Sequence, residues 1–572
     1  MLTAALQSSR DSPPPHGDLY NEAMRIVLIV SVAFTASVAR AQDSACSAIK
    51  TEVTLSGLSG RRIDSVSVET ARPNLGKAGR VVAKLHVRTR PEVIRRELLF
   101  APGDTVDTLA VAESLRRLRA LPFLEYARID ARQCASAVGE SLALTVVTRD
   151  SWTARPDLKA SSSSPRIGLT EHDLLGTGRT VSLDVVSRNR SLGAGVTALD
   201  NFGFGTGFTM RGQYQRYSDG AVRSLFFSRR QASLADRWRA SFEISDQRHE
   251  PRAPLSDNFE RATAELLTGV RLTPVSSSHA IYLLVGFESE SGSLNAAPNA
   301  DIVGPTRVDR HFAGPQIGTA IVATRYDTLT WLLAGGPVVD VPRTVEGEIL
   351  VGVGSGSVTE REIGGPVETA RSNFMTHYDA WIGREWIPTR QSRVVSDVWV
   401  GGYSRAGDWR SGRVRAAVSA EHAASNGIWR LTTAAEQLND PDPDVRALAI
   451  YDRALAFVPS RVRLAESAFT VSVERTRHLR PIGGALELDG SIYSAFSKRW
   501  DPASCNGPED VSVGVAGVGL SLSPRRSGRS TIRLDYGVPL LRTPGVQRSP
   551  RFAITLMPWL ESGRHRDNSG SF

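Results

Sequence analysis

The chain has 572 residues, 41% of them hydrophobic and 23% charged, and its 69 Lys and Arg against 60 Asp and Glu give a net charge of +9. This composition excludes an intrinsically disordered chain, which would carry fewer apolar residues and more net charge per residue. Three cysteines exclude a disulfide-rich scaffold and a four-cysteine metal site. A mean hydropathy of −0.18 argues against a bundle of membrane helices. It does not argue against a membrane barrel, whose lipid-facing and lumen-facing residues alternate and average out.

The N-terminus carries an uncharged apolar run from Ile26 to Ala39, preceded by Met24 and a basic residue. The run ends in the small-x-small triplet Ala39-Arg40-Ala41, the pattern of a secretory cleavage site. It is too short to span a bilayer as a helix, and a buried N-terminal helix is the alternative interpretation. We therefore expect residues 1–41 to be a signal peptide, with translation starting at Met24, and residues 42–60 to be a linker in an exported protein.

Cysteine and charge usage fit an exported protein without a nucleic-acid partner. Cys46 and Cys134 are able to form a disulfide in an oxidising compartment, which would leave Cys505 unpaired, and the sequence does not fix this pairing. The positive charge is nearly all arginine and is interleaved with acidic residues along the chain. Nucleic-acid-binding proteins usually concentrate such charge in a patch or a tail.

Residues 61–150 predict a small α+β domain with the order strand, helix, helix, strand, strand. Apolar residues at helical spacing predict one helix that begins at Pro91, a residue suited to a first helical turn. A second helix is predicted to be capped by Asp107 and ended by Pro122. An exposed strand edge of such a domain is able to accept an extended peptide by strand addition. The predicted strands are Ile63–Thr70, Tyr126–Arg132 and Leu142–Thr148.

Residues 155–560 lack helical periodicity and consist of short alternating segments separated by turn residues. In Thr531–Leu541, for example, Leu534 and its apolar neighbours take one face, and Arg533 and Asp535 take the other. In a soluble sandwich the apolar face would meet a second sheet, and in a membrane barrel it would meet lipid. The uninterrupted length is too great for one sandwich. Together with export, it predicts a mainly β protein with a transmembrane antiparallel β-barrel of about 16 strands, at roughly 25 residues per strand and connection.

Aromatic residues near the ends of several segments are typical of an interfacial girdle. They are Trp381, Trp386, Trp399, Trp429, Trp500 and Trp559.

The sequence carries no enzyme signature. It contains no G-x-S-x-G nucleophile turn and no H-x-x-x-H pair. The glycine clusters Gly203–Gly207 and Gly352–Gly356 do not open a helix, so we interpret them as turns or bulges in strands. A hydrolase set assembled across strands, from His377 with Asp379 and Ser396 with Asp397, is the enzymatic alternative. We expect no enzymatic activity, and no catalytic, metal or cofactor site.

Several segments resemble a known family. Residues 61–150 resemble a POTRA domain, a periplasmic module that precedes outer-membrane barrels. The segments that carry this likeness are Arg95–Phe100, Gly103-Asp104 and Ser114–Leu118. A generic small α+β domain is the alternative. The rest of the chain is similar to the BamA/TamA-type outer-membrane assembly family, also called bacterial surface antigen proteins. The segments that carry this second likeness are Val146–Trp152, Ile167–Gly178, Ile532–Leu540 and Phe552–Leu556.

The resemblance implies an arginine motif on an extracellular loop that folds back into the lumen. The best positional match is Val445-Arg446-Ala447-Leu448, in which alanine and leucine replace the glycine and the aromatic residue of the family. We expect Arg446 to pair with a lumenal carboxylate such as Glu474, or to be a loop arginine with no special partner.

The resemblance also implies a C-terminal strand that carries the barrel-assembly signal. Its candidate residues are Phe552, Ile554, Leu556, Trp559 and Leu560. A polar tail, residues 561–572, follows, and either Trp559 or Phe572 is the recognised aromatic residue.

The function that the resemblance implies is assembly, insertion or translocation of proteins at the outer membrane of a Gram-negative-type bacterium, with the POTRA-like domain in the periplasm. Its edge would capture substrate strands, and a seam between Pro165–Leu174 and Phe552–Leu560 would open laterally. The implied partners are outer-membrane lipid, unfolded outer-membrane or secreted polypeptides, and periplasmic or lipoprotein partners, with no nucleic acid, nucleotide or metal. A two-partner-type secretion pore and a passive porin-like channel or surface antigen are the alternatives.

Overall fold

The computed structural model describes the two regions predicted from the sequence except for the chain ends and several connections. The predicted signal peptide, residues 1–41, and the polar tail, residues 561–572, lie outside the described residues. No helix among the described residues is long and apolar enough to cross a membrane. The described residues are 46–48, 59–73, 86–136, 139–160, 166–188, 191–201, 203, 207–218, 220–229, 236–249, 258–274, 279–295, 307–329, 339–361, 367–405, 408–424, 427–439, 467–482, 486–500, 511–524, 530–542 and 550–558.

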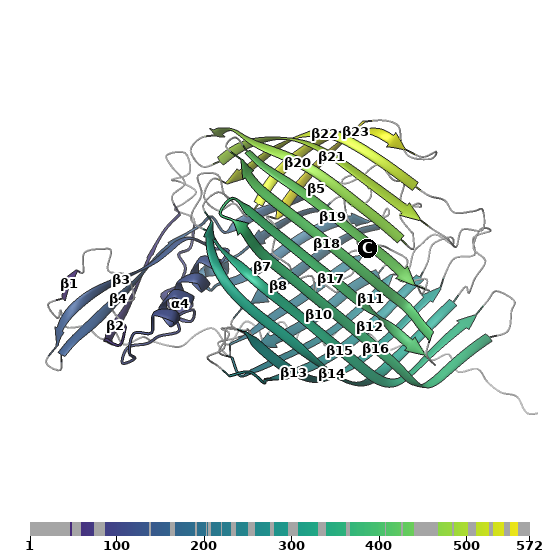
Figure 1. Ribbon diagram of the computed structural model, residues 1–572, viewed down its shortest axis with the longest axis horizontal. Coiled ribbons are helices and arrows are strands. Elements are labelled where there is room, and N and C mark those ends of the chain that lie inside the picture. The colour runs from purple at the N-terminus through teal and green to yellow at the C-terminus, as the bar shows by residue number, and fades with distance from the viewer. Residues whose placement is uncertain are drawn as a thin grey trace, which may run out of the picture.

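The N-terminal region is a four-stranded sheet with helices against one face (Figure 1). The strand order is β1-β3-β4-β2, in which β2 and β4 are parallel and the other neighbours are antiparallel. The order strand, helix, helix, strand, strand predicted for residues 61–150 is the order found. The elements are β1 (Cys46–Ala48), β2 (Arg62–Ala71), α3 (Pro91–Arg95), α4 (Thr108–Ala120), β3 (Leu124–Ser136) and β4 (Gly139–Asp150).

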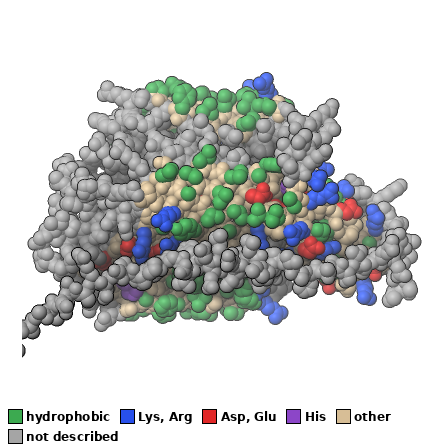
Figure 2. All heavy atoms as spheres, turned by 180° about the vertical axis from the view of Figure 1, so that it is seen from behind, with side chains coloured by type: hydrophobic (Ala, Val, Ile, Leu, Met, Phe, Trp, Pro, Cys, Tyr) green, Lys and Arg blue, Asp and Glu red, His purple; other side chains and the backbone are tan. Residues whose placement is uncertain are grey.

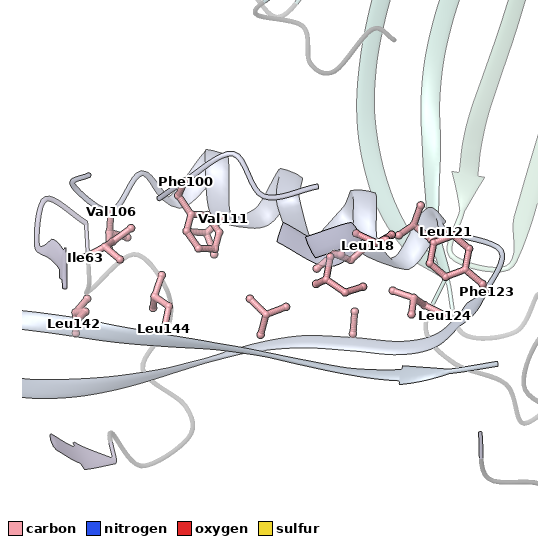
Figure 3. Packing of buried hydrophobic residues seen from close by; sticks show 14 residues of the cluster. Ile63, Phe100, Val106, Val111, Leu118, Leu121, Phe123, Leu124, Leu142 and Leu144 are labelled. Atoms are coloured by element: carbon pink, nitrogen blue, oxygen red, sulfur yellow. The ribbon is translucent and has the colours of Figure 1, made fainter. Parts of the chain in front are cut away.

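Local sequence explains why α4 begins where it does and which face it buries. The carboxylate of Asp107 accepts a hydrogen bond from the backbone N–H of Leu109 at 2.9 Å, which satisfies one of the free donors of the first turn. Val111 and Leu118 lie on the buried face of the helix and pack toward Leu144 of the sheet (Figure 3). This apolar layer holds the helix and the sheet together.

The remaining described strands, β5 to β24, form one closed antiparallel barrel in chain order, with β24 against β5. These are twenty strands among the described residues, compared with about 16 expected from typical strand spacing. Several connections are short, such as Arg390-Gln391 between β16 and β17, so the assumed 25 residues or so per strand was too long. The strands are β5 (Ala154–Ala160), β6 (Arg166–Glu171), β7 (Arg179–Arg188), β8 (Ser191–Asp200), β9 (Phe208–Tyr217), β10 (Gly220–Arg229), β11 (Trp238–His249), β12 (Asn258–Arg271), β13 (Ala280–Asn295), β14 (Arg307–Leu329), β15 (Val339–Arg361), β16 (Val367–Thr389), β17 (Ser392–Arg405), β18 (Asp408–Ala424), β19 (Gly427–Asn439), β20 (Ser467–Ile482), β21 (Leu486–Trp500), β22 (Val511–Pro524), β23 (Ser530–Arg542) and β24 (Arg551–Pro558).

The two faces of the barrel wall differ in chemistry because side chains alternate along each strand. On β23, Leu534 is exposed on the outside, whereas Arg533 and Asp535 are buried on the inside. Hydrophobic side chains gather on the outer surface (Figure 2). The exposed apolar residues of the barrel include Ile167, Leu169, Leu183, Leu225, Ile244, Leu266, Phe287, Ile317, Ile349, Ile382, Val398, Leu431, Val473, Ile492, Val518 and Leu534.

The first strand of the barrel precedes the segment that the sequence analysis chose for the seam. Its first strand is β5, Ala154–Ala160, and the predicted seam segment Pro165–Leu174 contains the second strand, β6. A short 3₁₀ turn, η2 (Leu174–Gly176), follows β6. Pro156 inside β5 concealed the strand, because proline weakens a strand prediction.

Two smaller sequence interpretations have opposite outcomes. The Gly352–Gly356 cluster lies in β15, and the register with β16 shifts between Gly354 and Gly356, which confirms the expected bulge. The aromatic girdle is wrong for Trp399, which lies on the inner face with its indole N–H donating to Asp379 at 2.8 Å.

Candidate functional site

A row of alternating charges begins on the inner face of the barrel at β16. Glu385 of β16 lies 2.6 Å from Arg393 of β17, and the same guanidinium lies 3.6 Å from Glu421 of β18. All three residues are buried, at 4–5% exposure. Their charges are therefore stabilised by each other rather than by water.

The row continues to β23. Arg430 of β19 lies 2.7 Å from Glu421 and 3.9 Å from Glu474 of β20. Glu474 also lies 2.5 Å from Arg533 of β23, whose Nε donates to both carboxylate oxygens of Asp535 at 2.8 Å. We refer to this set as the lumenal charge ladder; it comprises Glu385, Arg393, Glu421, Arg430, Glu474, Arg533 and Asp535.

A glycine on β22 explains how Arg533 reaches Glu474 across two intervening strands. Arg533 Nη2 donates to the hydroxyl of Ser491 on β21 at 2.8 Å. A Cβ atom at Gly519 of β22 would lie 2.9 Å from Arg533 Nη2 and 2.5 Å from Asp535 Oδ1. The absence of a side chain at Gly519 therefore provides the space that the end of the ladder occupies.

A second buried polar cluster lies on the inner face around Glu290 of β13. Arg310 of β14 lies 2.6 Å from its carboxylate, and the Tyr403 hydroxyl of β17 donates to it at 2.6 Å. Arg261 of β12 lies 3.3 Å away, and the ring of His377 stacks on Tyr403 with centroids 4.7 Å apart. Glu290 and Arg310 are buried, so this cluster is packed among neighbouring side chains of the inner wall.

Two residues of the enzymatic alternative, His377 and Asp379, are held by structural partners. His377 Nδ1 lies 2.6 Å from Glu288, and Asp379 accepts the indole N–H of Trp399. Among the residues that the structure describes, no group of three or more His, Cys, Asp or Glu is placed to hold a metal ion.

The barrel closes between its last and first strands over a short stretch. β24 pairs with β5 at two positions, Ile554 with Ala160 and Thr555 with Lys159. By contrast, β23 and β24 pair at eight positions, and β5 and β6 pair at six. Of the strand pairs that the structure describes in the barrel, this closure has the shortest backbone ladder.

The N-terminal domain meets the barrel at the turn that contains η2. The backbone N–H of Arg90 donates to the carbonyl of Gly176 at 2.9 Å. Gly176 has a φ of +73°, and a Cβ atom there would lie 2.2 Å from the carbonyl oxygen of Arg88. This close approach requires glycine both for its φ and for its lack of a side chain.

Two buried carboxyl groups face one hydroxyl at the same junction. The Thr89 Oγ1 atom lies 2.8 Å from Asp150 Oδ1 and 2.7 Å from Asp173 Oδ2. Asp150 Oδ2 also lies 3.0 Å from His86 Nε2 and accepts the Thr89 N–H at 3.0 Å. Asp173 Oδ1 accepts the N–H of Gly178 at 2.5 Å. Asp173 lies in the turn after β6, and burial raises its pKa. Its hydrogen bonds with Thr89 and Gly178 act in the opposite direction but are outweighed by burial.

The structure places only some of the site residues proposed from the sequence. Glu474 belongs to the lumenal charge ladder, with Arg430 and Arg533 as partners. Its expected pairing with Arg446 stays a prediction, because Val445 and Arg446 lie outside the described residues.

The proposed C-terminal signal lies partly on β24. Phe552 is exposed, and its ring centroid lies 4.7 Å from that of Tyr536 on β23. Ile554 and Leu556 pair with β23 in the backbone register. Trp559 and Leu560 lie beyond the last described residue, so the signal itself stays a prediction.

Sequence reasoning did not identify most of the ladder or the junction. A weak signal was present in the alternation of β23, which placed Arg533 and Asp535 on the face opposite Leu534. Their partners depend on strand register, which the alternation does not define. Asp150 and Asp173 lay within segments quoted for their family resemblance, but nothing local indicated that Thr89 would lie between them.

No family model matches this chain, and no curated protein sequence matches it. Among solved structures it is similar to BamA from Haemophilus ducreyi lacking POTRA domains 1–3, with 12% identity, a TM-score of 0.32, and coverage of 87% of this chain and 85% of that one. CdiB from Escherichia coli has 11% identity, a TM-score of 0.39, and coverage of 89% and 79%. The alcaligin outer-membrane receptor FauA from Bordetella pertussis has 10% identity, a TM-score of 0.35, and coverage of 75% and 80%. At these identities the function has to be argued from the chain itself.

Proposed function

We propose that this chain is an outer-membrane β-barrel that inserts or translocates other polypeptides, with its N-terminal domain on the periplasmic side. The observation that carries the proposal is the closure of β24 against β5 at two residue pairs. A barrel has no free strand edges when it is fully closed, and edges are the sites at which another strand pairs. Among the described strand pairs of the barrel, separation of β24 from β5 therefore breaks the fewest backbone hydrogen bonds, and the wall is expected to open there.

The lengths of the strands beside the closure support the same conclusion. β5 has 7 residues, β6 has 6 and β24 has 8, whereas β14, β15 and β16 have 23 each. A strand that crosses a bilayer needs about 9–11 residues. Over the residues that the structure describes, the wall beside the closure is therefore short for a membrane, and lipid there is expected to be thinned or disturbed.

The paired charges of the inner wall argue against a passive channel. A porin-like pore has a polar, water-filled interior. Here the charges of the lumenal charge ladder and of the Glu290 cluster are buried and paired with one another. The inner wall therefore carries charges that are already paired with one another, which favours a barrel that works at its wall.

The exposed apolar belt favours a membrane location for the barrel. Large exposed apolar areas are rare on soluble monomers. Here exposed apolar residues recur on strands from β6 to β23, and Figure 2 shows hydrophobic side chains gathered on the face of the barrel that it draws. Lipid is the environment that matches an outer face of this kind.

The test is a disulfide across the closure. Lys159→Cys with Thr555→Cys joins directly opposed residues of β5 and β24. Thr531→Cys with Met557→Cys joins β23 to β24 and is the matched control. Both pairs are introduced into a chain whose three native cysteines are replaced by serine. The purified proteins are reconstituted into phospholipid vesicles, and folding of an added, urea-denatured barrel protein is followed by its resistance to protease.

Oxidation of the 159–555 pair is expected to reduce insertion to the level of protein-free vesicles, and dithiothreitol is expected to restore it. The 531–557 pair is expected to have no effect in either state. Insertion that continues with the closure oxidised would contradict a lateral opening. Unchanged passage of a secreted polypeptide into the vesicles under the same conditions would favour the secretion-pore alternative.

A further inference from the structure

The junction between the N-terminal domain and the barrel holds more short oxygen–oxygen contacts than one hydroxyl proton is able to serve. Thr89 Oγ1 lies within 2.8 Å of both Asp150 and Asp173, and all three residues are at most 3% exposed. A threonine hydroxyl has one proton, and ionised carboxylates only accept hydrogen bonds. Two ionised carboxylates on one hydroxyl would leave one short contact between oxygens without a proton. A second proton at this site removes the conflict.

The hydrogen bonds of each carboxyl group indicate where that proton resides. Asp150 accepts from the Thr89 N–H and the Thr89 hydroxyl, and its Oδ2 atom lies 3.0 Å from His86 Nε2. With the imidazole proton on Nε2, all three contacts suit an ionised carboxylate. Asp173 accepts only the Gly178 N–H at one oxygen, so its other oxygen is free to carry a proton toward Thr89. The chain of donation then runs from the Asp173 carboxyl through the Thr89 hydroxyl to Asp150.

The other charged groups on the elements that meet at this turn do not replace the proton. Glu171 accepts the backbone N–H of Asp173 at 3.0 Å, and Arg179 of β7 lies 2.9 Å from Asp200. Arg88 approaches Gly176 through its backbone carbonyl, and Arg90 approaches it through its backbone N–H. The titratable and charged groups nearest the junction along the chain are His86, Arg88, Arg90, Arg149 and Asp150 on the N-terminal side, and Glu171, His172, Asp173 and Arg179 on the barrel side.

We propose that this junction is a proton-controlled latch: with a proton on Asp173 the N-terminal domain is held against the first hairpin of the barrel, and without it the domain is released. Loss of the proton to solvent leaves two carboxylates facing one hydroxyl in a buried site, where like charges repel strongly. The inference goes beyond the proposed function, because it concerns how the domain is attached and holds for any substrate.

The direction of the pH dependence follows from the raised pKa of Asp173. A carboxyl group whose pKa is higher in the attached state binds its proton more tightly there. Its contribution is fully present below the ordinary pKa of aspartic acid and is lost as the pH rises through the raised value. The latch is therefore closed in acid and opens toward neutral pH.

Hydrogen exchange of the full chain in lipid nanodiscs tests the proposal. After correction for the intrinsic pH dependence of exchange, protection of the Thr89 and Gly178 amides is expected to fall about tenfold per pH unit between the ordinary pKa of aspartic acid and the raised pKa of Asp173, the slope of one proton, and to level off above it. Asp173→Asn places a permanent N–H donor opposite Thr89, so its protection is expected to be independent of pH. Thr89→Ser keeps the hydroxyl and is expected to retain the wild-type slope.

The matched control is Asp184→Asn. Asp184 is a buried carboxylate of the neighbouring strand β7 and accepts from Gln215 Nε2 at 2.8 Å, and its replacement is expected to leave the slope of the junction amides unchanged. Infrared spectra supply a second readout: a carboxylic acid C=O band that vanishes as pH rises is expected in the wild type and absent from Asp173→Asn. Two results would overturn the latch. One is an equal dependence of amide protection on pH in the wild type and Asp173→Asn, and the other is the same carboxylic acid band in both proteins.

Discussion

Arg533 shows how a single residue terminates the lumenal charge ladder. Its guanidinium contacts Glu474, Asp535 and Ser491 within 2.8 Å, and its side chain is buried. Arg533→Met preserves length and apolar volume but leaves two carboxylates without this cation. We expect the free energy of unfolding to fall by about 3–5 kcal/mol, the usual effect of removing one partner from a buried ion pair. Urea unfolding in phospholipid vesicles, followed by tryptophan fluorescence, measures the change.

An exposed arginine provides the comparison. Arg248 lies 3.8 Å from Glu260, and its side chain is 60% exposed. Because solvent screens such a pair, Arg248→Met is expected to change the free energy of unfolding by about 1 kcal/mol or less. Equal losses for the two variants would mean that the ladder does not contribute as a buried network.

The sequence predicted which face Arg533 occupies but not what it binds. Alternation places Arg533 and Asp535 inside once Leu534 faces outward. Contact with Glu474 depends on the registers of three strand pairs and on the empty position at Gly519. Neither the registers nor the empty position is encoded in the local pattern of β23.

Among the elements, the η2 turn is the one whose backbone geometry depends most clearly on glycine. In Gly176→Ala the new methyl group would overlap the Arg88 carbonyl, and the hydrogen bond from Arg90 to residue 176 is expected to break. Loss of that bond is expected to lower local stability by about 1 kcal/mol or more. Faster hydrogen exchange at the Arg90 amide measures it.

Gly60→Ala separates backbone strain from steric overlap. Gly60 has a φ of +80°, close to the +73° of Gly176, but no atom lies within 4 Å of an added Cβ. Its replacement is expected to leave the exchange of the Arg90 amide unchanged. An effect of Gly60→Ala on this amide as large as that of Gly176→Ala would show that the close approach is not responsible.

The order of elements was predictable, whereas the first strand and the strand count of the barrel were not. Helix spacing and the Asp107 cap predicted α4, because these signals are local. β5 was missed because it is short and contains Pro156. The count was too low because tight connections such as Arg390-Gln391 place more strands in the same length of chain.

For the whole molecule, the arginine excess of the sequence has a structural explanation. Guanidinium groups make several directed hydrogen bonds to carboxylates and tolerate burial better than ammonium groups. The ladder uses Arg393, Arg430 and Arg533 as bridges between acidic residues on different strands. A net charge of +9 therefore accompanies an interior in which both signs of charge are paired.

Strand pairing is extensive on one side of the barrel and short at the closure. β14 and β15 pair at 21 positions, whereas β24 and β5 pair at two. Amide exchange reports the free energy of local opening, and each strand opens by breaking the ladders on both of its sides. The amides of β24 are expected to exchange faster than those of β14, with β23 between them because its other neighbour, β22, pairs over a longer stretch.

Exchange mass spectrometry of the barrel in lipid nanodiscs measures this order. The control is the same protein with the 159–555 disulfide, in which the difference in exchange between β24 and β14 should shrink. Equal protection of β24 and β14 in the uncrosslinked protein would remove the physical basis for an opening at the closure.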